Sequence, residues 1–247
     1  MESFKKLNNI IGWSVFAIAS FVYLSTIEQT VSFWDCGEYI ATAYKLEVGH
    51  PPGAPLFQLL GRIFSLFAEP ATSQVAVAVN VMSALCSSFT ILFLFWTITA
   101  FGKRMLVTKE ESNKDKFKMI SILAAGVVGA LTYTFTDSFW FSAVEGEVYA
   151  MSSFFTAITF WCILKWEEEA DQPSSSRWLI LIAYLIGLSI GVHLLSLLTI
   201  PAMGMIYYYK KYEYSKSGAI KAFIISMAAL GFVQGVLIPS AVSLISS

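Results

Sequence analysis

Seven apolar stretches constrain the fold of this 247-residue chain more than any other feature. A transmembrane helix needs about 20 mostly apolar residues, and most of the stretches approach or exceed that length. They lie at about residues 10–27, 52–68, 74–101, 119–136, 148–165, 178–209 and 220–240. The sequence therefore predicts an all-α polytopic membrane protein.

The composition excludes the soluble classes of protein. Apolar residues make up 56% of the chain and charged residues 13%, whereas soluble domains average about 45–50% and about 25%. Too few polar side chains remain to cover a surface that faces water on all sides. The formal net charge is −1, so the basic footprint of a nucleic-acid-binding protein is absent as well.

Two of the stretches do not fit a single crossing. The stretch at 178–209 is too long for one comfortable pass, and we predict a hairpin of two short helices there. The stretch at 52–68 is short, and its polar residues fall at helical spacing: Gln58, Arg62, Ser65 and Glu69. A helix with one polar stripe on an otherwise apolar surface favours the membrane surface over the hydrocarbon core.

The distribution of lysine and arginine supports both assignments and orients the chain. Basic residues accumulate on the cytoplasmic side of membrane proteins. With 52–68 on the outer surface and a hairpin at 178–209, all 16 basic residues except Lys45 and Arg62 face inward. The prediction is about seven transmembrane helices, with the N-terminus in the cytoplasm and the C-terminus outside.

This topology leaves two outer loops in a predicted single domain over 1–247, which we interpret as the N-terminal part of a longer protein. The first outer loop spans 28–74 and contains a predicted helix at about 35–47 in addition to the surface helix. The second outer loop spans 137–147.

The first outer loop carries the densest group of chemically useful side chains. Asp35 and Glu38 are three residues apart, so they share one face of a helix, and His50 precedes a Pro-Pro-Gly turn that restricts its position. Asp35 also lies at the start of the predicted helix, where the helix dipole stabilises a carboxylate. The structural alternative is that Asp35 only caps the helix on a solvated loop.

Further candidates lie in the second outer loop and in the 178–209 hairpin. Glu145 and Glu147 precede Tyr149 where a span begins, and interfacial aromatic belts do not explain a glutamate at that edge. His193 lies where the hairpin turns, and an ionisable residue within a membrane segment indicates function. The structural alternative for His193 is a bond to a backbone carbonyl at the helix break.

Several sequence motifs of known enzyme classes are absent, which limits the reactions that the protein could catalyse. No zinc-ligand spacing, phosphate-binding loop, nucleophile elbow or dinucleotide fingerprint occurs in the sequence. We therefore predict no metal ligands and no bound cofactor, while a requirement for a divalent metal stays open. What remains is a group of carboxylates and two histidines at the outer face, where a lipid-borne substrate could meet a polar acceptor.

At these residues the sequence resembles the GT-C superfamily of membrane glycosyltransferases, which use polyprenyl-phosphate sugars. More closely, it resembles the protein O-mannosyltransferase-like family, glycosyltransferase family 117. The match covers most of the chain in the same order, through the segments 35–39, 50–53 with 55–56, 140–150 and 191–201.

The resemblance implies an inverting transfer of a sugar, mannose-like, from a polyprenyl-phosphate donor to Ser/Thr hydroxyls of an exported protein. It also implies a multi-pass protein of the bacterial cytoplasmic (inner) membrane whose active site lies on the outer face. Asp35 would be the general base, which must lie within about 3 Å of the hydroxyl, and Glu38 would orient Asp35 or bind sugar. The remaining expected substrate-binding residues are His50, Arg62 and His193 for the lipid phosphate, with Glu145, Glu147 and Tyr149.

Two alternatives remain open from the sequence. A lipid or solute transporter would use the same histidines and carboxylates as a relay, although the acids cluster outside and no broken-helix pair repeats in two halves. The other alternative is a non-catalytic membrane scaffold. The donor sugar, the lipid length and the acceptor are not specified by the sequence.

Overall fold

The computed structural model describes residues 2–51, 53–106, 116–240 and 243, and this part of the chain is helical with no strand. The predicted all-α polytopic membrane fold is confirmed. Its elements are α1 (Glu2–Ser25), α2 (Cys36–Lys45), α3 (Pro55–Ser65), η1 (Leu66–Ala68), η2 (Thr72–Gln74), α4 (Val75–Leu106), α5 (Lys116–Thr134), α6 (Asp137–Val144), α7 (Val148–Glu169), α8 (Ser176–Ile190), η3 (Leu194–Leu198), α9 (Thr199–Lys211), α10 (Lys216–Phe232) and η4 (Val233–Leu237). Pro52 of the predicted turn and most of the 103–118 loop fall outside the described residues.

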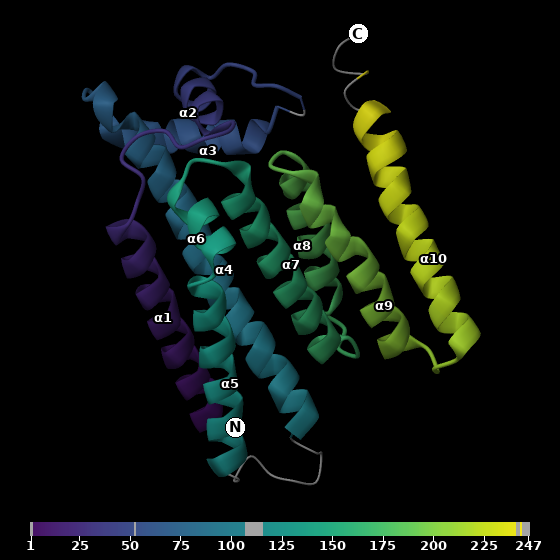
Figure 1. The fold of residues 1–247 in the computed structure, drawn as a ribbon. Helices are drawn as coiled ribbons and strands as arrows, with labels where there is room; N and C mark the ends of the chain where they lie inside the picture. Colours follow the sequence, from purple (N-terminus) through teal and green to yellow (C-terminus); the bar gives the residue numbers. More distant parts are fainter. Residues whose placement is uncertain (1, 52, 107–115, 241–242, 244–247) are drawn as a thin grey trace.

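Five helical segments of the described chain are long and apolar enough to cross a membrane: Phe4–Ser25, Thr72–Leu106, Lys116–Thr134, Val148–Glu169 and Lys216–Ser240. The longest of them contains α4, which contacts α1, α5 and α7 and forms the centre of the bundle. Helix α4 is apolar around its whole circumference, as expected for a helix that is surrounded by other helices. Helix α10 lies at the edge of the bundle, against α9 (Figure 1).

The stretch at 178–209 is a pair of short helices, as predicted. Helix α8 ends at Ile190, and the chain continues through η3 into α9. Both helices pack against α7 and run in opposite directions beside it (Figure 1). At 15 and 13 residues they are shorter than the roughly 20 residues of a full crossing, so the count of seven spans stays a prediction.

The helices alternate in direction along the bundle. Helices α1, α5, α8 and α10 run towards the end that carries α2 and α3, and α4, α7 and α9 run away from it (Figure 1). The links from α4 to α5, from α7 to α8 and from α9 to α10 therefore share the opposite end. That end carries most of the basic residues of the described chain, several of them in ion pairs, such as Arg177 with Glu169 and Lys211 with Asp171. The fold thus separates a basic end from an acidic end.

Helix α3 lies across the end of the bundle, not alongside the spans (Figure 1). Its polar stripe faces protein: Gln58 is buried and donates a hydrogen bond to Thr42 of α2. The opposite face is apolar and exposed, at Leu59 and Ile63 among others. An exposed apolar face at this level matches a helix that rests on a membrane surface.

The orientation of the two ends can be tested with single cysteines. We expect Ser73→Cys, at the α3–α4 connection, to react with an impermeant thiol reagent in intact cells. We expect Ser174→Cys, at the α7–α8 connection, to react only after the membrane is permeabilised. The parent protein is the control, because two of its three cysteines are buried. The reverse labelling pattern would overturn the topology.

Candidate functional site

Asp35 is the residue at which the chain enters α2, and its carboxylate lies at the surface. The residue occupies the N-cap position of α2, yet its side chain makes no capping hydrogen bond. Its side chain is 59% exposed. The preceding residue, Trp34, has a φ of 65°, a left-handed conformation that costs a residue with a side chain about 1–3 kcal/mol. The structure does not support the alternative that Asp35 serves as a helix cap.

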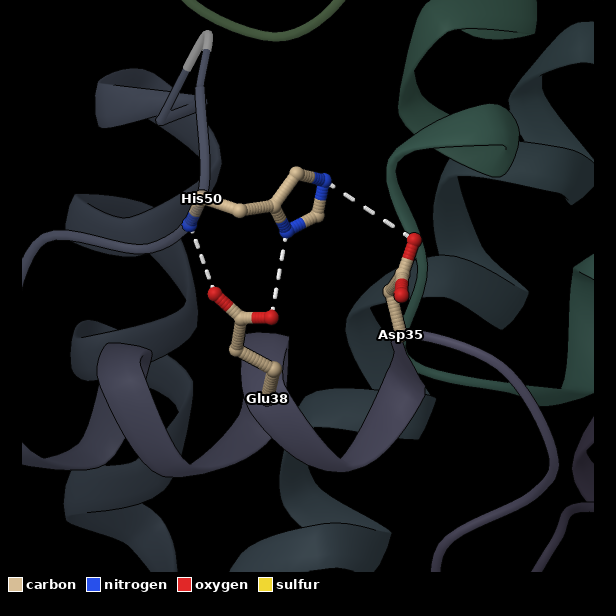
Figure 2. A group of neighbouring side chains, drawn as sticks. All are labelled: Asp35, Glu38 and His50. Atoms are coloured by element: carbon tan, nitrogen blue, oxygen red, sulfur yellow. Dashed lines mark hydrogen bonds and ion pairs between the residues drawn. The ribbon is translucent and has the colours of Figure 1, made fainter.

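Glu38 holds His50 in place through both of its carboxylate oxygens (Figure 2). The backbone N–H of His50 donates to Oε1 at 2.6 Å, and Nδ1 lies 3.1 Å from Oε2. An ionised carboxylate only accepts hydrogen bonds, so Nδ1 carries the proton in this contact. The backbone bond from His50, followed by the side-chain bond, lowers the pKa of Glu38.

This contact points the other ring nitrogen of His50 at Asp35. His50 Nε2 lies 3.8 Å from Asp35 Oδ2. The imidazole also rests against the ring of Tyr39, with the centroids 5.6 Å apart. Glu38 therefore positions His50, and His50 lies beside the exposed carboxylate of Asp35.

The second outer loop packs directly behind this group. It consists of α6 and the short segment from Glu145 to Glu147. Gly146 lies so close to α2 and α4 that a Cβ there would meet Asn80 Oδ1 at 2.9 Å and Ile40 Cγ1 at 3.0 Å. Glycine is required because these two contacts leave no room for a side chain.

Glu145 links the two outer loops, and its side chain is not accessible to solvent. It is buried, it accepts a hydrogen bond from Ser32, and burial raises the pKa of its carboxyl. Nearby, Asn80 donates to the carbonyl oxygens of Glu28 and Thr30. This arrangement indicates a structural role for Glu145, which fixes the segment that leads to Asp35.

Glu147 is the buried carboxyl of the site, with 5% of the residue exposed. Burial, followed by the charges of Glu145 and Asp35, raises the pKa of Glu147 to about 6, and a hydrogen bond from the Asp35 backbone opposes the rise. Glu147 therefore lies against Asp35 and changes its charge near neutral pH.

His193 joins the site from the 178–209 hairpin. Its ring lies 5.4 Å from the ring of Tyr149, and the backbone N–H of Leu56, in α3, donates to the carbonyl oxygen of Gly191 at 2.7 Å. The Nδ1 atom of His193 accepts a hydrogen bond from the Leu195 backbone at 3.2 Å, so Nε2 carries the proton. The neutral ring is therefore a hydrogen-bond donor at Nε2.

Arg62 is engaged elsewhere on α3. Its guanidinium pairs with Glu69 at 3.0 Å and stacks over the ring of Tyr44. The structure thus brings together Asp35, Glu38, His50, Glu147, Tyr149 and His193, while Glu145 and Arg62 make contacts of their own.

Two features of the site were missed in the sequence. Tyr39 packs among the carboxylates, and burial with the charge of Asp35 raises its pKa to about 12. Asn80 secures the first outer loop from within the apolar helix α4. An asparagine near the start of an apolar span was the available signal for Asn80.

A metal ion could be held by Asp35, Glu38 and His50, whose ligand atoms lie within 4.8 Å of one another. Two carboxylates and an imidazole suit several divalent cations. In this structure Glu38 is hydrogen-bonded to His50, and His50 in turn lies beside Asp35.

A groove of about 960 Å³ lies between α4, α5 and α7, and Tyr149 of the site is one of its lining residues. Its upper rim includes Thr136, Tyr149 and Leu195, and Ala157 and Phe160 lie deeper. Threonines in the walls donate to carbonyls of their own helices, as Thr156 does to Ser152. The groove therefore presents a largely apolar surface.

The buried Glu147 predicts a pH-dependent stability. Because its folded pKa of about 6 lies above the ordinary 4.5, its stabilising effect is complete below about pH 4.5 and is lost as the pH rises through about 6. We expect Glu147→Gln to increase the free energy of unfolding at about pH 8 by at most about 2 kcal/mol, which thermal unfolding shows as a higher Tm. At about pH 4.5 the substitution should change Tm little. Equal shifts at both pH values would contradict the assignment.

The comparisons with known proteins identify a family. The family model described as the protein O-mannosyl-transferase TMEM260 N-terminal domain matches residues 35–216, a range that contains every predicted site residue. No solved structure matches the chain.

Two curated relatives carry the same name. The protein O-mannosyl-transferase tmem260 of Dictyostelium discoideum is 27% identical over 197 residues, 76% of this chain and 22% of the relative. The protein O-mannosyl-transferase TMEM260 of Mus musculus is 26% identical over 178 residues, 72% of this chain and 22% of the relative. The chain spans about a fifth of the length of these relatives. On the family match, which covers well over half of its residues, the chain belongs to the protein O-mannosyl-transferase TMEM260 N-terminal domain family.

Proposed function

We propose that this protein takes part in protein O-glycosylation, and that it moves a mannose-like sugar from a polyprenyl-phosphate donor to Ser or Thr hydroxyls. The observation that carries the proposal is the carboxylate of Asp35, which caps nothing and faces solvent beside His50. The names of the two relatives support the same activity.

Asp35 is the general base in this proposal. It takes the proton from the acceptor hydroxyl as that oxygen attacks the anomeric carbon of the sugar. The bond from the anomeric carbon to the phosphate oxygen breaks on the opposite side, so the configuration inverts and polyprenyl phosphate leaves. Glu38 stays ionised, and its two hydrogen bonds with His50 hold the imidazole ring in position.

The leaving phosphate needs hydrogen-bond donors or positive charge. His193 offers the proton on Nε2, and its ring lies against Tyr149 at the rim of the groove. His50 is the second candidate in its protonated form, because the imidazolium carries a positive charge and Nε2 is then a donor. Arg62 was expected to contribute, but its pairing with Glu69 makes it the weakest of the three.

The groove between α4, α5 and α7 supports a lipid-linked donor. It is apolar, it lies among helices long enough to cross a membrane, and it ends beneath the site. A polyprenyl chain that lies there would bring its phosphate to Tyr149 and His193. The exported protein would approach from the solvent side of Asp35.

The predicted outer location of the site follows from the charge asymmetry of the two ends. The two relatives are eukaryotic, so the bacterial cytoplasmic membrane remains a prediction from the sequence resemblance alone.

The central substitution is Asp35→Asn in the full-length protein. The amide has nearly the same shape but does not accept the hydroxyl proton, so transfer from a radiolabelled polyprenyl-phosphate sugar to a Ser/Thr acceptor should fall about 10²–10⁴-fold. Asp137→Asn is the matched control, because Asp137 is an exposed aspartate at the start of α6, and it should retain activity.

Related variants separate the alternatives. Glu38→Gln should reduce transfer less than Asp35→Asn, because Glu38 acts through His50. A scaffold would tolerate both changes, and a proton-coupled transporter would show no sugar transfer to lose. Wild-type turnover in Asp35→Asn, together with an inactive Glu147→Gln, would assign the base to the other loop.

The groove gives a separate prediction. Ala157→Trp should fill it and raise KM for the lipid-linked donor about tenfold, a size typical for the loss of well-packed apolar contacts. Ile180→Trp, on an exposed face of α8, is the matched control and should leave KM unchanged. An unchanged KM in Ala157→Trp would remove the groove from the donor site.

A further inference from the structure

A second cavity lies at the basic end of the bundle, opposite the candidate site. Its volume is about 790 Å³, and α1, α4 and α7 form its walls. Three tryptophans and three lysines stand out among its lining residues: Trp13, Trp96, Trp161, Lys5, Lys103 and Lys165.

The charges of this cavity do not cancel. Two carboxylates line it, but each has a basic partner: Glu168 pairs with Lys165 at 2.7 Å, and Glu169 pairs with Arg177 at 2.6 Å. Lys5 and Lys103 have no acidic partner within the described residues. The cavity therefore keeps two uncompensated positive charges.

The tryptophans form a continuous aromatic wall. The rings of Trp13 and Trp96 are 6.2 Å apart and those of Trp96 and Trp161 are 5.7 Å apart, measured between centroids. Tryptophan concentrates at the level of lipid headgroups, where one part of the ring is apolar and the other is wet. Asn8 and Trp96 both line the cavity. Their Oδ1 and Nε1 atoms are buried without a hydrogen-bond partner within the described part.

We propose that this cavity binds one anionic phospholipid from the leaflet at the basic end. Lys5 and Lys103 hold its phosphate, and Trp13, Trp96 and Trp161 cover the glycerol and the first part of the acyl chains. A basic pocket between transmembrane helices at the cytoplasmic side suits an anionic headgroup. The wall of indole rings favours a lipid over free phosphate, because free phosphate has no apolar part to bury.

This site is independent of the proposed function. It lies at the opposite end of the bundle, and it uses none of the residues assigned to sugar transfer. The helices that form it, α1, α4 and α7, include the central helix of the fold, so the lipid would join three spans at one membrane face.

The test is native mass spectrometry of the full chain from mixed micelles of phosphatidylglycerol and phosphatidylcholine. We expect one retained phosphatidylglycerol, and we expect its preference over phosphatidylcholine to fall about 30-fold in Lys5→Gln/Lys103→Gln. Lys216→Gln/Lys221→Gln is the matched control, because it removes the same charge at the start of α10, outside the cavity. It should leave the preference unchanged.

Several results would overturn the proposal. Equal retention of the two lipids by the wild type would remove the headgroup selectivity, and an equal loss in the control variant would reduce the effect to net charge. Displacement of the lipid by inorganic phosphate would make the site a phosphate site. Absence of retained lipid from the full chain would indicate that another protein segment fills the cavity.

Discussion

A polar group without a hydrogen bond in the hydrocarbon layer costs free energy, and this constraint determines where the polar groups of the molecule lie. Each backbone donor and acceptor within the bilayer needs an internal partner, so the spans must be helices. Several hydroxyl side chains inside the spans donate hydrogen bonds to carbonyl oxygens of their own helices, as Thr90 and Thr156 do. The remaining charged groups are concentrated at the two ends of the bundle: one end has an excess of carboxylates, and the other has most of the lysines and arginines, several of them paired with glutamates and aspartates.

At the acidic end, contacts between distant segments hold the reactive group. Ser32 and Glu145 join the two outer loops, and Asn80 fixes the first of them from α4. Glu38 uses both oxygens on His50. The carboxylate of Asp35 stays exposed to solvent within this framework. The proposed chemistry follows from that exposure.

Helical periodicity and length predicted most of the fold. The hairpin at 178–209 and the separate helix at 52–68 followed from span length and from the spacing of polar residues. The structure has the hairpin, and it has a helix, α3, that lies across the end of the bundle. The helix predicted at about 35–47 is α2, at Cys36–Lys45. Local sequence is sufficient for these features because each depends on the pattern within one segment.

The partners within the site could not be predicted in the same way. Arg62 was grouped with the phosphate ligands, but its guanidinium forms an ion pair with Glu69, seven residues later. Glu145 was grouped with substrate, but Ser32 binds it from the other loop. These pairings depend on how loops fold back on each other, and one sequence carries no record of distances between separate segments.

The central claim is tested most directly by a structure of the full-length protein with a non-cleavable polyprenyl-phosphonate sugar and a serine acceptor peptide. The account predicts that the serine hydroxyl lies about 3 Å from the carboxylate of Asp35, with the polyprenyl chain between α4, α5 and α7. A hydroxyl that contacts Glu147 or His50 instead, with Asp35 turned away from the acceptor, would contradict it.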